Sequence, residues 1–311
     1  IGHQSLNDRL RISLTGDYTT DNNQLPGDVT TLLNALRTLP PNAPEAFDAE
    51  GQLVWTPGLT NPYAMLMRKT TSRSHNISGN AVISYQLDKG LLLKLSAGSN
   101  NTQLRTEGQY PRSSFNPASR PVNSAYINAQ EARSWIAEPQ LSYVVEKGNL
   151  KVDALLGGSF QNQFSRTESV QGSDFANDNL LNNMSAAGSI LFSNFYSQYR
   201  YQAVFSRFGF NWDNKYVLNL SGRRDGSSRF GPHKRFSNFG AVGAAWIFSD
   251  EPFIGKLSWL SFGKLRASYG TTGNDQIGDY QFLDTWSRSS LYPYLGTSVM
   301  VPDQLFNPDY V

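Results

Sequence analysis

Long stretches in which apolar and polar residues alternate constrain the fold of this chain more than any other feature. In segment 76–87, apolar or small residues occupy the odd positions, and Asn, Ser and Gln dominate the even ones, interrupted only by Val82. A period of two places these sets on opposite faces of a β-strand. The segment is also long enough to cross a bilayer obliquely, which takes about 9–11 residues.

The same pattern recurs in pairs of segments that are joined by short turns. Residues 88–90, 147–148 and 213–215 have the Gly, Asn and Asp content of tight hairpin turns. The strands expected from the alternation span about residues 6–18, 76–87, 91–101, 135–146, 150–161, 199–212, 216–224, 236–248 and 262–272. A tenth strand, at 280–288, is counted if it finds a partner. These signals predict an all-β, antiparallel fold of about 9–10 strands.

Short and long connections alternate along the chain, and this regularity favours a membrane barrel. The connections at about 20–74, 107–134 and 169–196 are long, whereas those between them are short. Outer-membrane barrels combine short periplasmic turns with long extracellular loops. The connection 229–235 is a modest exception, because it is short and lies on the long-loop side. The alternative is a soluble β-sandwich whose aromatic residues fill a core.

Composition agrees with strands that meet lipid on one face and water on the other. Only 17% of the residues are charged, 39% are hydrophobic and 13% are aromatic, and Tyr and Trp near strand ends are typical of interface belts. No apolar run reaches the ~18 residues of a spanning helix, so any membrane span must be a strand. A net charge of +2 leaves no basic footprint for nucleic acid.

The sequence offers no chemistry that points to an enzyme. It has no cysteine, its three histidines are far apart, and it lacks a Gly-x-Ser-x-Gly elbow. We therefore expect no catalytic residue, no metal and no cofactor. The loop aromatics Trp55, Tyr110 and Phe115 are weak candidates for substrate binding, because aromatic rings stack on sugars and peptide side chains. Packing of loop on loop is an equally good explanation for them.

Three ordered motifs in the second half resemble those of SusC/RagA-type TonB-dependent outer-membrane transporters. They read GRRDGSSRFG at 222–231, AWIFSDEPF at 245–253 and GKLRASYGTTGN at 263–274. The loop sequence NALRTLPP at 34–41, followed by NPY at 61–63, is similar to a loop of the same family. The motif residues expected to shape the wall and rim are Arg224, Asp225, Gly226, Ser227, Ser228, Arg229, Phe230, Gly231, Tyr269, Gly270, Gly273 and Asn274.

These motifs have a direct physical interpretation as barrel architecture. Residues 225–228 are expected to bend a strand at the extracellular rim, with Gly226 allowing a positive φ. Arg223, Arg224 and Arg229 could bind an anionic substrate or lipopolysaccharide. Paired charges in the barrel wall are the explanation that we favour for these arginines.

The resemblance implies a place and a function for the whole chain. Residues 1–311 would be part of one TonB-dependent receptor β-barrel domain of about 22 strands, with the plug domain and the C-terminal closing strands absent. The family imports large nutrients, oligosaccharides or peptides, across the bacterial outer membrane. Its partners would be a SusD-like lipoprotein lid, TonB through the missing plug region, and outer-membrane lipid. The alternative is a secreted or surface β-sheet adhesin or binding protein without transport activity.

Overall fold

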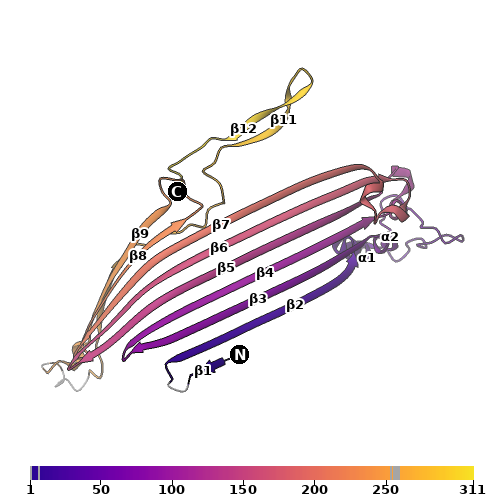
Figure 1. Cartoon of the computed structure of the whole chain (residues 1–311). Helices are drawn as coiled ribbons and strands as arrows, with labels where there is room; N and C mark the ends of the chain where they lie inside the picture. The colour runs from indigo at the N-terminus through magenta and orange to yellow at the C-terminus, as the bar shows by residue number, and fades with distance from the viewer. Residues whose placement is uncertain (1, 6–7, 253, 255–259) are drawn as a thin grey trace.

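In the computed structural model, which describes residues 2–5, 8–252, 254 and 260–311, the chain forms a curved antiparallel sheet of ten strands (Figure 1). Each strand pairs with the next one along the chain. The strands are β1 (Gly2–Gln4), β2 (Leu10–Pro26), β3 (Lys69–Asp88), β4 (Leu91–Tyr110), β5 (Ser124–Lys147), β6 (Leu150–Phe175), β7 (Ala187–Trp212), β8 (Tyr216–Ser227), β9 (Phe236–Trp246) and β10 (Leu265–Gly270). The prediction of an all-β antiparallel fold is confirmed.

The three short turns lie where the sequence predicts them. Gly90 has φ +80° in the β3–β4 turn, and Gly148 has φ +59° in the β5–β6 turn. A Cβ at Gly90 would come within 2.1 Å of the carbonyl oxygen of Val144, so only glycine fits there. In the β7–β8 turn, Asp213 and Asn214 both adopt the left-handed conformation. Asn and Asp tolerate this conformation better than other side chains.

In the short-turn half of the sheet, most apolar positions of the long strands fall on one face, which we call the apolar face. The registers place Tyr143, Ala154, Phe208, Leu220, Val242 and Tyr269 in one row across β5 to β10. On β3, Ile77 is 57% exposed, whereas its polar neighbours on the opposite face are less exposed. The described residues contain no second sheet that packs on the apolar face. A soluble sandwich would cover this face, so the prediction of a lipid-facing wall is preferred.

The strand ends predicted from the sequence were wrong in the long-loop half of the sheet. β6 and β7 each run for 26 residues. The loops expected at 107–134 and 169–196 therefore shrink to 111–123 and 176–186. Polar residues occupy both faces of this half, for example Arg166 and Thr167, so the alternation that identifies a strand is lost there.

Two differences concern the ends of the chain. The expected first strand at 6–18 begins at Leu10 and continues to Pro26, and Leu6 lies outside the described residues, as does Phe253 of the second motif. The bounds of the expected strand at 280–288 were wrong, and its partner is a strand that the sequence did not predict. The structure instead has β11 (Thr285–Tyr294) and β12 (Thr297–Gln304), which form a separate hairpin. The tenth strand of the sheet is β1.

The sheet changes height abruptly between β7 and β8. β8 has 12 residues and β9 has 11, and both begin or end at the short-turn end of the sheet. The long-loop end of β7 therefore rises above its neighbour (Figure 1). The β9–β10 connection, 247–264, lies at the short-turn end and is a second exception to the alternation of loop lengths.

The longest connection, 27–68, carries two helices. α1 (Val29–Thr38) begins after Asp28, whose side chain accepts a hydrogen bond from the Thr31 backbone N–H at 2.8 Å. α2 (Pro62–Met67) is capped by Asn61 in the same way. Neither these nor any other helix in the described part of the chain has the length and hydropathy to traverse a bilayer.

Candidate functional site

A cluster of aromatic and charged residues lies on the polar face at the long-loop end of β8 and β9, level with the middle of β7. Tyr199 and Tyr201 come from β7, Asp225 from β8 and Phe239 from β9. All four occupy odd positions, and the registers place odd positions of these three strands on the face opposite Phe208 and its row. The alternation of side chains along the strands therefore places all four on the same face of the sheet.

Arg229 is the central connection of this cluster. Its Nε donates to Asp279 Oδ1 at 2.8 Å, and its Nη1 donates to the backbone oxygen of Asp275 at 3.0 Å. The guanidinium lies 4.2 Å from the ring centroid of Tyr199, whose hydroxyl donates to Asp275 Oδ2 at 2.5 Å. Burial alone would lower the pKa of Arg229, but hydrogen bonding and attraction to Asp279 outweigh it and raise the pKa. Loop 271–284 is thereby fixed to the rim.

A second arginine is paired within the wall. The Nε of Arg223 donates to Asp225 Oδ1 at 2.5 Å, and its Nη2 donates to the hydroxyl of Tyr201. Arg224 points to the apolar face instead, where its guanidinium lies 5.2 Å from the ring centroid of Phe236. The favoured interpretation of paired wall charges therefore holds for Arg223 and Arg229. Among the described residues, Arg224 forms no ion pair.

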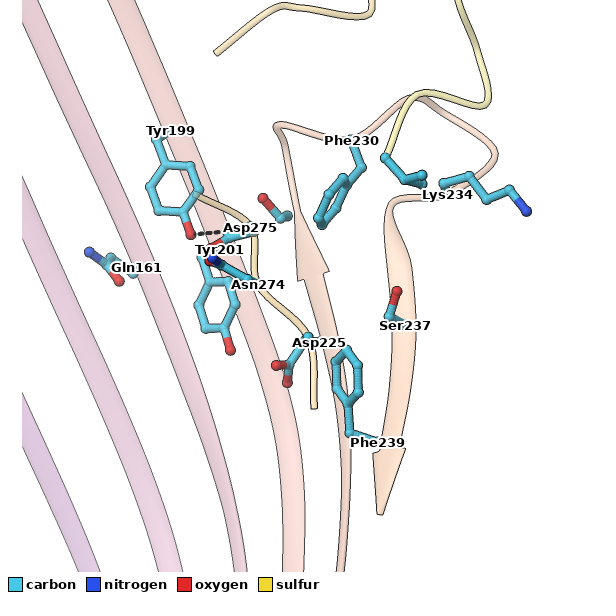
Figure 2. A pocket seen from close by; sticks show the side chains of 13 residues that line it. Gln161, Tyr199, Tyr201, Asp225, Phe230, Lys234, Ser237, Phe239, Asn274 and Asp275 are labelled. Atoms are coloured by element: carbon cyan, nitrogen blue, oxygen red, sulfur yellow. Dashed lines mark hydrogen bonds between the residues drawn. The ribbon is translucent and has the colours of Figure 1, made fainter. Parts of the chain in front are cut away.

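These residues line a cavity of about 470 Å³, which we call the rim cavity. Figure 2 shows Tyr199 and Tyr201 on one side and Phe230 and Phe239 on the other, with Asp225 between them. The lining is completed by Gln161, Ser227, Lys234, Ser237, Gly273, Asn274, Asp275 and Val311. A volume of this size is typical of sites that bind a small molecule or one unit of a larger one.

The glycines of the motifs allow close packing rather than unusual backbone angles. Gly226 lies inside β8, and it is not among the glycines with positive φ, so the predicted role in a bend was wrong. A Cβ at Gly226 would lie 2.6 Å from the ring of Phe236, and one at Gly273 would lie 2.4 Å from the ring of Phe239. Replacing Gly273 would therefore displace a wall of the cavity.

The remaining motif residues surround the cavity without all lining it. Ser228 joins the rim to β7, because its backbone N–H donates to the Arg200 carbonyl at 2.9 Å. Gly231 donates to the Tyr310 carbonyl at 2.9 Å. Tyr269 is 76% exposed on the apolar face, next to Gly270 at the end of β10. Of the twelve motif residues predicted to shape the rim, the cavity brings together Asp225, Ser227, Phe230, Gly273 and Asn274.

The loop aromatics proposed from the sequence lie elsewhere. Tyr110 and Phe115 meet across the guanidinium of Arg68, which is 5.9 Å and 4.1 Å from their ring centroids. Arg68 also donates to Ser114 Oγ at 3.1 Å, and burial lowers its pKa. These contacts fit the alternative of loop packing. Trp55 is half-buried in loop 27–68 and does not line the rim cavity.

Sequence reasoning missed Tyr199, Tyr201 and Phe239. The signal was present, because aromatic residues at odd positions of β7 and β9 interrupt a face that is otherwise polar or small. What the sequence lacked was the registers of β7 with β8 and of β8 with β9, which place these side chains around one cavity. The described residues also contain no group of three or more His, Cys, Asp or Glu side chains suited to a metal ion.

A second cluster of hydrogen bonds joins loop 111–123, between β4 and β5, to loop 176–186, between β6 and β7. Asp178 accepts hydrogen bonds from the backbone N–H of Arg112 at 2.8 Å and from Asn123 Nδ2 at 2.9 Å. Its other oxygen accepts from the backbone N–H and the hydroxyl of Ser113, both at 3.2 Å. Burial raises the pKa of Asp178, but these hydrogen bonds together outweigh it and lower the pKa.

A single-layered antiparallel sheet with an exposed apolar face and a polar face that carries paired charges is a segment of a transmembrane β-barrel. No protein-family model matches the chain. Relatives and solved structures do match, and they define the kind of barrel.

The chain is 29% identical over 262 residues to the TonB-dependent receptor P26 of Formosa agariphila, covering 80% of this chain and 26% of that protein. It is 35% identical over 77 residues to the TonB-dependent receptor SusC of Bacteroides thetaiotaomicron, covering 25% of this chain and 8% of SusC. The structure of the RagAB peptide transporter superposes with a TM-score of 0.78 at 26% identity, covering 98% of this chain and 35% of that chain. The chain is therefore similar in sequence and in fold to TonB-dependent receptors of the SusC/RagA type.

The chain spans only part of these relatives, about a quarter of the Formosa agariphila receptor. The relatives are named as receptors and transporters, not as enzymes. This agrees with the absence of catalytic motifs in the sequence.

Proposed function

We propose that this chain is the barrel-wall and extracellular-loop segment of an outer-membrane active importer of large nutrients, oligosaccharides or peptides. Transport would be energised through TonB, and a SusD-like surface lipoprotein would act as a lid. The likeness to SusC and to the RagAB peptide transporter supports this assignment. It also supports a location in the bacterial outer membrane and one barrel domain for residues 1–311.

The observation that carries the proposal is the position of the rim cavity. It lies on the polar face at the long-loop end of β8 and β9, so in a closed barrel it would face the lumen above the lipid. A nutrient entering from outside would meet this cavity before it reached the part of the wall within the membrane. We propose the cavity as a substrate-contact site, in place of Trp55, Tyr110 and Phe115.

The lining suits neutral polar ligands that carry flat faces. The rings of Tyr201 and Phe239 can stack on a sugar ring or a peptide side chain. Gln161, Ser237 and Asn274 can exchange hydrogen bonds with hydroxyl or peptide groups. Arg223 and Arg229 form ion pairs with Asp225 and Asp279, and the lining residues Lys234 and Asp275 carry opposite charges, so the cavity has no excess charge that would attract an ion.

The proposal is tested by uptake measurements on the full-length transporter in a deletion strain. The probes are fluorescently labelled maltohexaose and a labelled tryptic digest of casein. We expect the Tyr201→Ala/Phe239→Ala variant to weaken apparent affinity for the imported probe by roughly 5- to 100-fold, corresponding to ~1–3 kcal/mol for two stacked rings. The matched control is Phe208→Ala, an aromatic position of the same strand on the apolar face. The proposal fails if deletion of the gene leaves uptake of both probes unchanged. The cavity assignment fails if the double variant and the control behave alike.

A further inference from the structure

The drop in height between β7 and β8 leaves one edge of β7 open. β8 pairs only with the stretch from Tyr201 to Trp212. Above it, from Ala187 to Arg200, β7 has β6 as its only neighbouring strand in the described structure. The wall therefore has a step, and along it backbone N–H and C=O groups of β7 point sideways, in the plane of the sheet, away from β6.

The direction of these groups follows from the contacts at the foot of the step. The backbone N–H of Arg200 donates to Ser228 Oγ at 2.9 Å, and that of Gln198 donates to the hydroxyl of Tyr280 at 2.8 Å. Backbone groups alternate sides along a strand, so the even positions 190–196 direct theirs to the same side. In the described part of the chain, these groups have no hydrogen-bond partner.

The open edge lacks the protection that exposed edges usually carry. Residues 187–199 include no charged side chain and no proline. Leu191, Phe195 and Tyr196 are 67%, 64% and 64% exposed, on both faces of the strand. Natural sheets guard long exposed edges with charges, proline or bulges, because a bare apolar edge pairs with another strand. This edge therefore needs a partner.

A hairpin with a free outer edge lies close along the chain. β11 and β12 pair only with each other and stand off the ten-stranded sheet (Figure 1). Leu291 is 81% exposed and Met300 is 60% exposed. An isolated two-stranded hairpin is marginal in water. The base of this hairpin is held, because Tyr280 contacts the backbone of Gln198 and the backbone N–H of Asn307 donates to the Phe282 carbonyl at 2.9 Å.

We infer that the β11–β12 hairpin docks through β11 on the open edge of β7 and extends the sheet by antiparallel pairing. β7 runs from the long-loop end toward the short turns, and β11 starts at the foot of the open edge, so a β11 that climbs the edge runs antiparallel to β7. The eight residues of β11 that precede Pro293 are enough to cover positions 190–197, and Pro293, which has no N–H, lies beyond them. Docking continues the contact that Tyr280 already makes with the same edge.

The short tether favours the hairpin over any separate partner. Only residues 281–284 separate the Tyr280 anchor from β11. A short linker gives an effective concentration in the millimolar range, far above that of a free peptide or of another protein in the membrane. The structure shows the undocked arrangement. Docking would extend the sheet above β8, so the hairpin would fill the step beside β7.

Disulfide trapping in the full-length transporter tests the inference. The chain has no cysteine, so introduced pairs can be read individually. Ser193→Cys on the edge is combined in turn with Ser287→Cys, Ser289→Cys and Ser290→Cys on β11. Paired antiparallel strands bring Cα atoms within the distance that a disulfide requires. At least one of the three pairs should form a disulfide under mild oxidation.

The matched control lies at the same height, three strands away. Thr106 pairs with Asn128, Asn128 with Ser169, and Ser169 with Ser193, so all four share one cross-strand row. Thr106→Cys is therefore about 14 Å from the edge position along the row. We expect its crosslinking to the same hairpin positions to be roughly tenfold lower, because docking creates a local concentration only at the edge.

Two outcomes would overturn the inference. If no pair forms and an aqueous maleimide labels Ser193→Cys freely, the edge stays open. If no pair forms and Ser193→Cys resists labelling, a different segment or a partner protein covers the edge. Either result can be told apart from failure of the proposed function, because crosslinking is read without any substrate.

Discussion

Replacing Ile83 with Arg should destabilise the assembled barrel strongly, whereas replacing the adjacent Val82 with Arg should not. Ile83 lies on the apolar face, paired with Ile12 on one side and Leu95 on the other. Val82 lies at the same depth on the opposite face, between Ser13 and Ser96. The two variants make nearly the same chemical change, and they differ in the face that receives the charge.

The magnitude follows from the depth of Ile83. The apolar positions of β3 run from Ile77 to Leu87. With a strand tilt of about 40°, each residue rises about 2.5 Å along the membrane normal, so these ten steps span about 25 Å. This equals the height of the apolar band of an outer-membrane barrel, and its midpoint falls at residue 82. Ile83→Arg therefore places a guanidinium near the midplane, which costs about 2–4 kcal/mol.

The assay is urea unfolding of the full-length transporter in phospholipid vesicles, followed by the heat-modifiable shift of the folded band. Ile83→Arg should lower the folding equilibrium constant by roughly 30- to 1000-fold. Val82→Arg should remain close to the parent protein, because its charge faces the aqueous lumen. Equal destabilisation by both variants, or a neutral effect of Ile83→Arg, would refute the assignment of the two faces.

Three further predictions concern the loops and the rim. Asp178→Asn should loosen loop 111–123, and the parent protein should show the same loosening in acid. Because the pKa of Asp178 is lowered in the folded state, its contact is fully present above the ordinary carboxyl pKa. The contact is lost as the pH falls through the lowered pKa. Hydrogen exchange against pH measures both effects. Arg229→Lys keeps the charge but loses the paired hydrogen bonds to Asp279 and to the Asp275 carbonyl. The free energy of local opening of the segment that carries Asp279 should fall by about 1 kcal/mol, which is measured as faster hydrogen exchange; unchanged exchange would contradict this. On intact cells, protease should cut loops 111–123 and 176–186, and cutting confined to the short turns would invert the topology.

The sequence predicts the lipid-embedded part of this fold well, because lipid imposes a strict alternation there. Every expected strand from 76 to 272 has its counterpart in the sheet, and the three tight turns lie within a residue of their predicted places. The apolar set on β3, including Ile77 and Ile83, was assigned from the period alone. Hydrocarbon tolerates neither a polar side chain outward nor an unpaired backbone group.

Prediction failed where that constraint ends. In the upper part of β6, Ser165 and Ser169 lie in a continuous strand, although the surrounding sequence is polar on both faces. There the structure depends on backbone pairing with β5 and β7, which leaves no mark in the pattern of side chains. The rim cavity was missed for a related reason, because the registers of two pairings are what place Tyr201 and Phe239 on one cavity. Cross-strand register is a tertiary property that periodicity alone does not specify.

In the outer-membrane location proposed above, the length of β5, β6 and β7 determines how far the loops reach from the cell. At about 2.5 Å of height per residue, the 26 residues of β6 rise about 65 Å, of which the lipid accounts for about 25 Å. Loops 111–123 and 176–186 would thus stand about 40 Å above the hydrocarbon on a stiff, doubly hydrogen-bonded support. An antibody, a phage or a large solute that approaches the cell would meet these loops well before it reached the bilayer.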